Sequence, residues 1–168
     1  MKHLFILASV MLIVGCKRGA DFEKALATCQ QHIENDSYTV ADSCMRAFFI
    51  QYELPVSTEK LSEGTFEGIS TPDAEGFVHK ATLIVKDGVL VSAFYDEIKG
   101  DKLKSADTAF YVQPDSIQKG FTAGEIFKFY EQELLVRKNI MDINCIANTR
   151  KTLLRVRLAA ALALDKAN

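Results

Sequence analysis

The architecture of this 168-residue chain follows from residues 76–97, GFVHKATLIVKDGVLVSAFYDE. Two runs rich in β-branched and aromatic residues flank Asp87-Gly88, and this dipeptide supplies the positive φ angles that a two-residue type I′ turn requires. The segment therefore predicts an antiparallel hairpin. Its alternation puts His79, Ala81, Leu83 and Val85 on one face, and Val78, Lys80, Thr82, Ile84 and Lys86 on the other. Because neither face is purely polar, we expect both to be covered, one of them by helices.

Helical patterns lie on both sides of this hairpin. Residues 20–54 contain two amphipathic segments, which predict a helical hairpin followed by a linker to residue 62. The apolar positions are Phe22, Leu26, Cys29 and Ile33 in the first segment, and Val40, Cys44, Ala47, Phe48 and Tyr52 in the second. Thr39-x-x-Asp42 is a variant of the capping box, and Thr122-x-x-Glu125 opens a helix that runs to about Lys138.

A short strand is expected at GTFEGIS, residues 64–70, and the last helix begins near Thr149. The segment TAFYVQP, residues 108–114, is compatible with an edge strand or with a helical turn. The order of these elements predicts an α+β fold, in which a small antiparallel sheet packs with helices after an N-terminal helical hairpin.

The first 16 residues, MKHLFILASVMLIVGC, indicate where in the cell the protein is located. Lys2 precedes an apolar run from Leu4 to Val14, which is too short to span a bilayer but suits the core of a signal peptide. The ending resembles the lipobox of bacterial lipoproteins, in which residues 1–15 are removed and Cys16 carries the lipid. We therefore expect a lipid-anchored protein of the cell envelope, facing the periplasm or the exterior. In a cell with two membranes, a lysine rather than an aspartate directly after the lipidated cysteine, here Lys17, resembles the pattern of lipoproteins sent to the outer membrane. An ordinary secretory signal is the alternative.

The remaining cysteines and the composition narrow the possibilities further. An exported setting permits disulfides, and Cys29 and Cys44 are equally distant from a turn-like Asn-Asp-Ser at residues 35–37, which predicts that they pair and leave Cys145 free. The formal net charge of −2 gives no support for nucleic-acid binding. The sequence lacks a Gly-rich phosphate loop, a G-x-S-x-G motif and the spacing of zinc or calcium ligands, so we assign no catalytic or metal-binding residue.

One family resemblance is specific. Residues 63–97 resemble the opening of FMN-binding domains, and KLKSADTAFY and YEQELLVRKNIMDI resemble the version found in bacterial pheromone-precursor-type lipoproteins. The resemblance implies an FMN-binding-like domain over residues 63–168. The family's motif, D-x-x-[ST]-G-A-T, lies just before the last helix, and in some members its final threonine is esterified to the FMN phosphate. Here Asp142 and Ala147 match, whereas Cys145, Ile146 and Asn148 stand in place of Ser or Thr, Gly and the acceptor Thr.

The resemblance implies FMN as the cofactor, bound noncovalently. Asn148 has no hydroxyl to esterify, and Thr149 lies one position late. The free N–H groups at the start of the last helix would receive the phosphate, assisted by Asn148, Thr149, Arg150 and Lys151. Phe94, Tyr95, Phe110 and Tyr111 are candidates for the wall against the flavin ring. In the alternative, the basic residues pair with Asp142, Glu131 or Glu133, and the aromatic residues belong to the core.

Two functions follow, and neither is that of an enzyme with its own substrate. The first is extracytoplasmic electron carriage, with membrane or soluble redox proteins as partners. The second is a flavin-less member of the family that serves as a protein-binding or structural envelope lipoprotein. In the second case, the helical hairpin would provide a surface for a homodimer or for another envelope protein. Phe48, Phe49 and Ile50 support a partner there, because one helix cannot bury three consecutive apolar residues against a single small face.

Overall fold

The computed structural model describes residues 19–112, 120–146 and 148–168. It contains four helices and a small four-stranded antiparallel sheet, with two helices before the sheet, so the predicted α+β class is confirmed. No helix within these ranges combines the length and the hydropathy needed to cross a bilayer. The predicted signal peptide and Cys16 lie outside the described residues.

The sheet is built around the predicted hairpin. Its strands are β1 (Gly64–Ile69), β2 (Val78–Lys86), β3 (Val89–Lys99) and β4 (Lys102–Leu103), in that spatial order and all antiparallel. Asp87 and Gly88 have φ angles of 51° and 73°, as a type I′ turn requires, so the predicted turn is confirmed. A second, two-stranded sheet pairs β5 (Phe110–Val112) with β6 (Phe121–Thr122), which decides between strand and helical turn for TAFYVQP.

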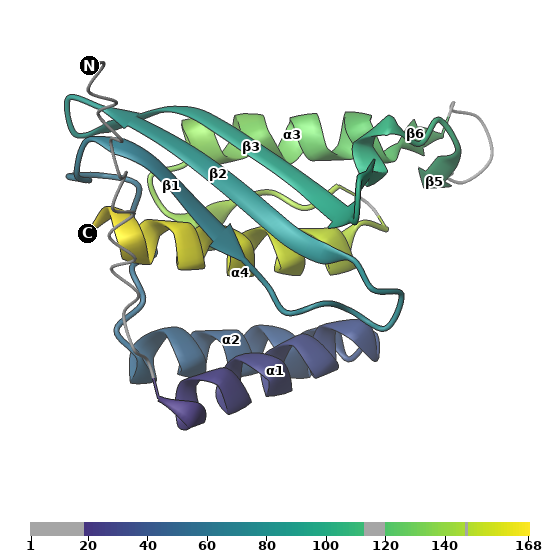
Figure 1. Cartoon of the computed structure of the whole chain (residues 1–168), viewed down its shortest axis with the longest axis horizontal. Coiled ribbons are helices and arrows are strands. Elements are labelled where there is room, and N and C mark those ends of the chain that lie inside the picture. Colours follow the sequence, from purple (N-terminus) through teal and green to yellow (C-terminus); the bar gives the residue numbers. More distant parts are fainter. Residues whose placement is uncertain (1–18, 113–119, 147) are drawn as a thin grey trace, which may run out of the picture.

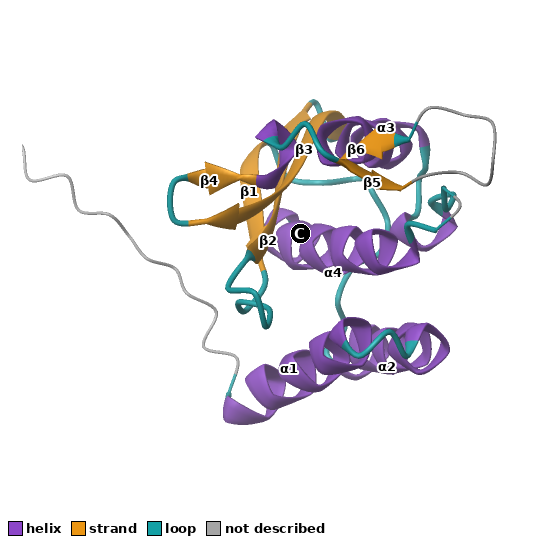
Figure 2. Ribbon diagram, turned by 90° about the vertical axis from the view of Figure 1, so that its right-hand side faces the viewer, coloured by secondary structure: helices purple, strands orange, loops and turns teal. Residues whose placement is uncertain are grey.

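The molecule has three layers (Figures 1 and 2). One face of the sheet is covered by α3 (Ala123–Val136), which lies along β3, and by α4 (Arg150–Ala167), which lies along β1 and β2. The pair α1 (Ala20–Glu34) and α2 (Tyr38–Gln51) packs against the far side of α4. Because α4 lies between the sheet and this helical pair, it is buried over most of its surface, which explains its Leu- and Ala-rich sequence.

A glycine permits the close contact between β1 and α4. A Cβ added at Gly68 would collide with the backbone oxygen of Ala159 and would lie 2.5 Å from the amide nitrogen of Ala163. Such distances are below van der Waals contact, so only glycine fits between the strand and the helix backbone.

The helical pair forms, with two differences from the sequence prediction. Cys29 and Cys44 form the predicted disulfide, with a Cα–Cα distance of 5.5 Å, and Cys145 is free and exposed. The predicted capping box at Thr39 and Asp42 is wrong, because α2 begins at Tyr38 after Ser37 and has no side-chain cap. The capping box at Thr122 and Glu125 is confirmed.

The buried side of α2 also differs from the predicted one. Its buried residues are Ala41, Met45, Phe48 and Phe49, whereas Val40 and Ala47 are exposed. Packing against α4 therefore selected a neighbouring stripe of the helix. Phe48 and Phe49 are both buried within the chain, with the Phe48 ring 5.1 Å from that of Phe22, and only Ile50, 79% exposed, stays at the surface.

The expectation that both faces of the hairpin are covered is wrong for the described part of the chain. The face with His79, Ala81, Leu83 and Val85 is buried against α3 and α4. No described helix lies over the opposite face, as Figure 2 shows. There Thr82 and Ile84 are half-buried and Phe94 is exposed. Mixed polar and apolar residues made this face resemble a covered one in the sequence.

Candidate functional site

The basic residues at the start of α4 find their anionic partners inside the protein. Lys151 donates from Nζ to the backbone oxygen of Glu34 at 3.1 Å and lies 2.9 Å from Oδ1 of Asp36, at the turn between α1 and α2. The predicted partners Asp142, Glu131 and Glu133 are therefore wrong for Lys151. Glu131 instead accepts the amide of Tyr95 at 3.0 Å, and Glu133 accepts that of Asn144 at 2.8 Å.

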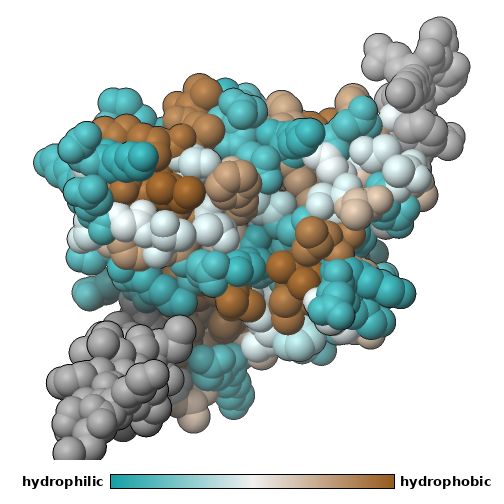
Figure 3. Space-filling view, turned by 45° about the horizontal axis from the view of Figure 1, so that its top comes forward, coloured by the Kyte–Doolittle hydropathy of each residue, from teal (hydrophilic) through white to brown (hydrophobic). Residues whose placement is uncertain are grey.

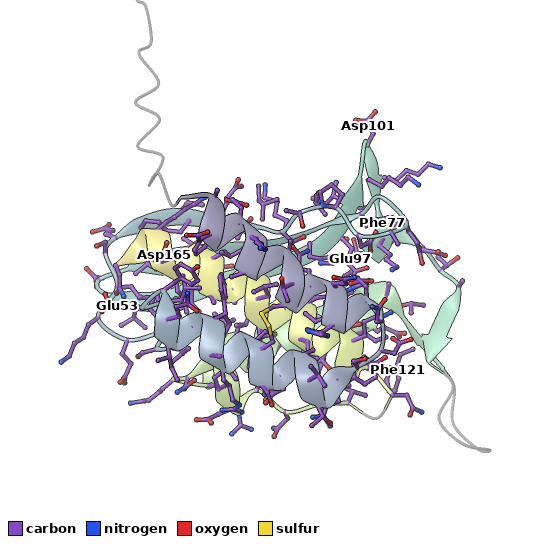
Figure 4. All side chains as sticks on the ribbon, turned by 90° about the horizontal axis from the view of Figure 1, so that it is seen from below. Glu53, Phe77, Glu97, Asp101, Phe121 and Asp165 are labelled. Atoms are coloured by element: carbon purple, nitrogen blue, oxygen red, sulfur yellow. A yellow bond between two sulfur atoms is a disulfide. The ribbon has the colours of Figure 1, made fainter. Side chains whose placement is uncertain are left out.

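Arg155 is the centre of a buried ionic cluster. Its Nη1 lies 3.0 Å from both carboxylate oxygens of Glu97, and its Nη2 lies 2.5 Å from Glu34 and 3.1 Å from Asp73. These carboxylates come from β3, from α1 and from the loop between β1 and β2. Glu97 is 1% exposed and Arg155 7%, and Figure 4 shows Glu97 inside the outline of the molecule. The cluster therefore ties the helical pair to the sheet through α4.

The protonation states follow from burial and from these partners. Burial alone would raise the pKa of Glu97, but Arg155 and Lys104, at 3.0 and 2.7 Å, hold it below its ordinary value. The pKa of Asp73 is lowered despite burial, because the Phe77 amide, His79 and Arg155 stabilise its charged form. Burial, together with Arg155, lowers the pKa of His79. Glu97 and Asp73 are therefore ionised and His79 is neutral at pH 7.

Three of these groups have the composition of a metal site. The ligand atoms of Glu34, Asp73 and His79 lie within 4.8 Å of one another. Arg155 already binds both carboxylates, so a cation at this point would have to displace a charged guanidinium. The arrangement is that of an ion-pair network rather than of an open coordination site.

Arg157 has a different role. It donates to the backbone oxygens of Ile140, Met141 and Ile143 at 3.1, 2.6 and 3.1 Å, and it lies 3.3 Å from a carboxylate oxygen of Asp42. It therefore holds the segment that precedes α4 against the helix. Arg150 is exposed and makes no ion pair with any other residue in the described ranges.

The residues aligned with the flavin motif are partly brought together. Asp142 is exposed, and Cys145 is exposed with its thiol directed at the Ile146 oxygen, 3.2 Å away. Asn148 is exposed with a φ of 62°, a conformation that Asn tolerates better than most residues. Ala147 lies outside the described residues.

Thr149 is the only buried hydroxyl in this loop, at 3% exposed. Its Oγ1 lies 2.5 Å from the hydroxyl of Tyr130 and donates to the Ile146 oxygen at 2.9 Å. The side chain is therefore occupied by internal hydrogen bonds and is not presented to a phosphate.

A small pocket lies at this end of α4. Asn148, Thr149 and Lys151 line it, together with Lys104, Arg155 and Glu97. Its volume is about 170 Å³. Pockets that bury most of a drug-sized ligand span roughly 300–1,000 Å³, so this one has room for a small group only.

The predicted aromatic wall does not form around this pocket. Phe94 and Tyr95 are neighbours on β3, so they point to opposite faces of the sheet. Phe94 is 53% exposed on the uncovered face. Tyr95 is 3% exposed in the core, where its ring meets that of Phe127 edge-on at 5.0 Å. Phe110 and Tyr111 belong to β5, and their side chains lie outside the described part of the chain.

A larger groove lies at the β3 edge of the sheet and opens onto the uncovered face, and two of the predicted wall residues, Phe94 and Tyr95, both line it. It measures about 660 Å³ and runs between β3, β4 and the start of α3. Phe94, Ile98 and Leu103 supply its apolar lining, and Lys80, Lys128 and Glu131 are among its charged residues. The aromatic candidates Phe94 and Tyr95 and the mixed alternation of the hairpin were the signals for it in the sequence. Figure 3 shows apolar areas separated by polar ones on the side that includes the top of the molecule in Figure 1.

Comparison of the chain with protein-family models, with curated proteins and with solved structures finds no match. The resemblance to FMN-binding domains therefore stays a prediction from residues 63–165.

Proposed function

We propose that this chain is a lipid-anchored binding protein of the bacterial cell envelope, in which the flavin-binding role of the resembled family has been lost. The lipobox-like ending at Cys16 supports the anchor and the envelope location. The ionic cluster around Arg155 is the observation that supports the loss of flavin.

The charge balance at the start of α4 opposes a bound phosphate. The cations at this end of α4 are Arg150, Lys151, Arg155 and Lys104, and the last three pair with the carboxylates of Glu34, Asp36, Asp73 and Glu97. A dianionic FMN phosphate would therefore meet cations that are already neutralised, apart from the exposed Arg150. A phosphate that reached Arg155 would have to displace the buried carboxylates that this guanidinium binds.

A flavin titration tests this part of the proposal. Residues 17–168 contain every described residue and omit the predicted anchor. We expect the protein to leave the absorption spectrum of FMN unchanged up to about 1 mM FMN. At that concentration, FMN would half-saturate a site with a binding free energy of about −4 kcal/mol. Saturable binding in the micromolar range, or flavin that stays with acid-precipitated protein, would contradict the loss of flavin.

The anchor requires its own test with the full chain. Expressed in a two-membrane bacterium, it is expected in the membrane fraction with a mass that equals residues 16–168 plus lipid. Cys16→Ser should remove the lipid mass and release the protein. Cleavage at another position, or membrane attachment that survives the substitution, would refute the anchor without bearing on flavin.

Noncovalent FMN carriage is the second candidate. It is favoured by one observation: Asn148, Thr149 and Lys151 line a common pocket, beside the exposed Arg150. If this candidate is correct, Arg150→Ala and Lys151→Ala each weaken FMN binding. Lys86→Ala, which removes an exposed cation at the end of β2 that lines neither this pocket nor the larger groove, is the matched control and should leave FMN binding unchanged.

A further inference from the structure

Four element ends meet at one end of the molecule, which we call the turn end. It contains the start of α1, the ends of α2 and α3, and the β2–β3 turn, all on the left in Figure 1. The segment after α2 connects them. Thr58 donates its amide to the oxygen of Lys138, just past α3, at 3.0 Å, and Glu59 forms a β-bridge with Val89 beside the turn. Glu53, just after α2, marks the same end in Figure 4.

The predicted lipid-bearing residue is tethered close to the turn end. α1 begins at Ala20, and its Phe22 ring lies 5.1 Å from that of Tyr52, directly after α2. Three peptide bonds separate Cys16 from Gly19, the first described residue, and three residues span at most about 11 Å. If Cys16 carries a lipid, as proposed, the start of α1 therefore lies within about 11 Å of the bilayer surface.

The turn end also carries the most exposed apolar side chains. Among the large apolar residues of the described ranges, the three most exposed are Ile50 at 79%, Val136 at 70% and Val89 at 59%. Ile50 lies in the last turn of α2, Val136 ends α3, and Val89 begins β3 directly after the turn. Because three separate elements present apolar side chains at one end, this end indicates an apolar contact outside the chain.

A groove of about 670 Å³ lies between two of these side chains. Val89, Leu90 and Val136 give it an apolar lining, and Lys60 and Lys138 are among its charged residues. Apolar side chains flanked by lysines suit the boundary between lipid headgroups and acyl chains, where the methylene stems stay in the apolar layer and the ammonium groups reach the phosphates.

The exposed charges of the turn end have both signs, so the contact does not depend on an anionic lipid. They include the cations Lys60, Lys86 and Lys138 and the anions Glu53, Glu59 and Asp87.

We infer that the turn end lies on the surface of the membrane that holds the lipid of Cys16, with Ile50, Val89 and Val136 entering the interfacial layer. The inference rests on the proposed anchor and deepens it, because it names a protein surface that binds the same membrane. Leu103 of β4 pairs with Ile98, nine residues along β3 from Val89 and therefore about 30 Å away. The opposite end, with the larger groove and the start of α4, then faces away from the bilayer and is accessible to other envelope proteins (Figure 1).

The outer side of the helical pair is the alternative membrane-facing surface, because it includes the start of α1 as well. Its exposed residues are largely polar, as at Gln31, Thr39 and Ser43. Apart from Ile50, the only large apolar residue exposed on α1 or α2 is Val40, at 50%. The distribution of apolar side chains therefore favours the turn end over this side.

Photo-crosslinking to lipid tests the inference. The lipidated full chain carries p-benzoylphenylalanine at Ile50, Val89 or Val136, in phosphatidylcholine vesicles that contain an alkyne-tagged phosphatidylcholine. The matched controls carry it at Val40, on the same helix as Ile50, and at Leu103, at the opposite end; these side chains are 50% and 49% exposed. We expect lipid adducts from the three positions of the turn end and none from the controls. Equal yields at all five positions, adducts from the controls alone, or no adduct would overturn the inference.

A second version of the experiment reads the surface without the lipid of Cys16. Residues 17–168 are held on phosphatidylcholine vesicles by a histidine tag before Lys17 and a nickel-chelating lipid, which keeps the tether at the same point of the chain. The same pattern of adducts is expected, and its absence refutes the inference. Lipidation of Cys16 is read by mass in the full chain, so failure of the proposed anchor and failure of this surface give different results.

A substitution at a second position shows whether the apolar side chains hold the orientation. Val136→Asp removes the burial of one valine, which should shift the equilibrium between this orientation and all others by at least about ten-fold and lower the adduct yield from position 50. Val40→Asp is the matched control and should leave that yield unchanged. Unfolding curves show whether each variant is folded. An unchanged yield in folded Val136→Asp would count against the inference.

Discussion

Replacing Arg155 with methionine removes the charge at the centre of the buried cluster and keeps a side chain of similar length. Glu97 and Asp73 then lose a cation at 3.0 and 3.1 Å while remaining buried, with side chains 1% and 2% exposed. Removing one partner of a buried pair costs about 3–5 kcal/mol. Glu97 keeps Lys104 at 2.7 Å and Asp73 keeps His79 at 3.3 Å, so we expect the lower end, about 3 kcal/mol at pH 7.

The pH dependence of this loss distinguishes lost charge pairing from lost packing. In the unsubstituted chain, folding lowers the pKa values of Glu97 and Asp73. Their ion pairs therefore stabilise the folded state above about pH 4, and this stabilisation disappears as the pH falls through their pKa values in the folded protein. In Arg155→Met the same groups are buried with one cation fewer, which shifts their pKa values upward. Protonation then relieves the variant as the pH falls, so the difference in stability narrows between pH 7 and about pH 4.

The assay is urea unfolding of residues 17–168 followed by circular dichroism at several pH values. Arg150→Met is the matched control, since Arg150 also lies in the first turns of α4 but is exposed, and a surface substitution of this kind changes stability by about 0.5 kcal/mol at most. A loss below about 1 kcal/mol for Arg155→Met, or a difference that widens on acidification, would refute the reasoning.

Three further predictions concern stability and use the same unfolding assay. Gly68→Ala should cost about 3 kcal/mol or more, because its Cβ would collide with the backbone of α4. Gly19→Ala, at the N-cap of α1 with nothing within 4 Å, should cost about 1 kcal/mol at most. Equal effects would contradict the close contact of β1 with α4. Replacing Cys29 and Cys44 together by alanine should lower the free energy of unfolding by about 3 kcal/mol, as expected for a disulfide that closes a loop of 15 residues. Cys145→Ala should leave it unchanged, because this cysteine is free and exposed. A disulfide-free variant of full stability would count against the bridge. Thr149→Val should lower the free energy of unfolding by about 1–3 kcal/mol, because the buried Tyr130 hydroxyl loses a partner at 2.5 Å. Thr152→Val, at a partly exposed position of α4, is the control. Similar losses in both variants would show that the Tyr130 contact is not the cause.

The fold was largely predictable because its signals are local. The Asp87-Gly88 turn, the alternation of β2 and the capping box of α3 each depend on residues within a few positions of one another. The disulfide was predictable for a related reason, since two helices joined by a tight turn bring residues equidistant from that turn together. The rotation of α2 was not predictable, because Val40 and Ala41 are both apolar and only packing against α4 chose between them.

The candidate site was harder to predict because its residues are distant in the sequence. The cations at the start of α4 suggested an external anion, and the cost of placing positive charge at a helix N-terminus made that reasonable. The anions that offset this charge are Glu34, Asp73 and Glu97, which lie 121, 82 and 58 positions from Arg155. No spacing within the motif could have indicated them.

The sequence by itself determined the hairpin, the helices and the disulfide, because these depend on periodicity, turn chemistry and local distance. Only the tertiary structure decided that Arg155 binds carboxylates from three other segments, that Phe94 and Tyr95 point to opposite faces of the sheet, and that no described helix covers one of these faces. The physical reason is that ion pairs and buried surfaces form between elements whose relative placement is set by packing of the whole core, and a linear pattern does not contain that placement.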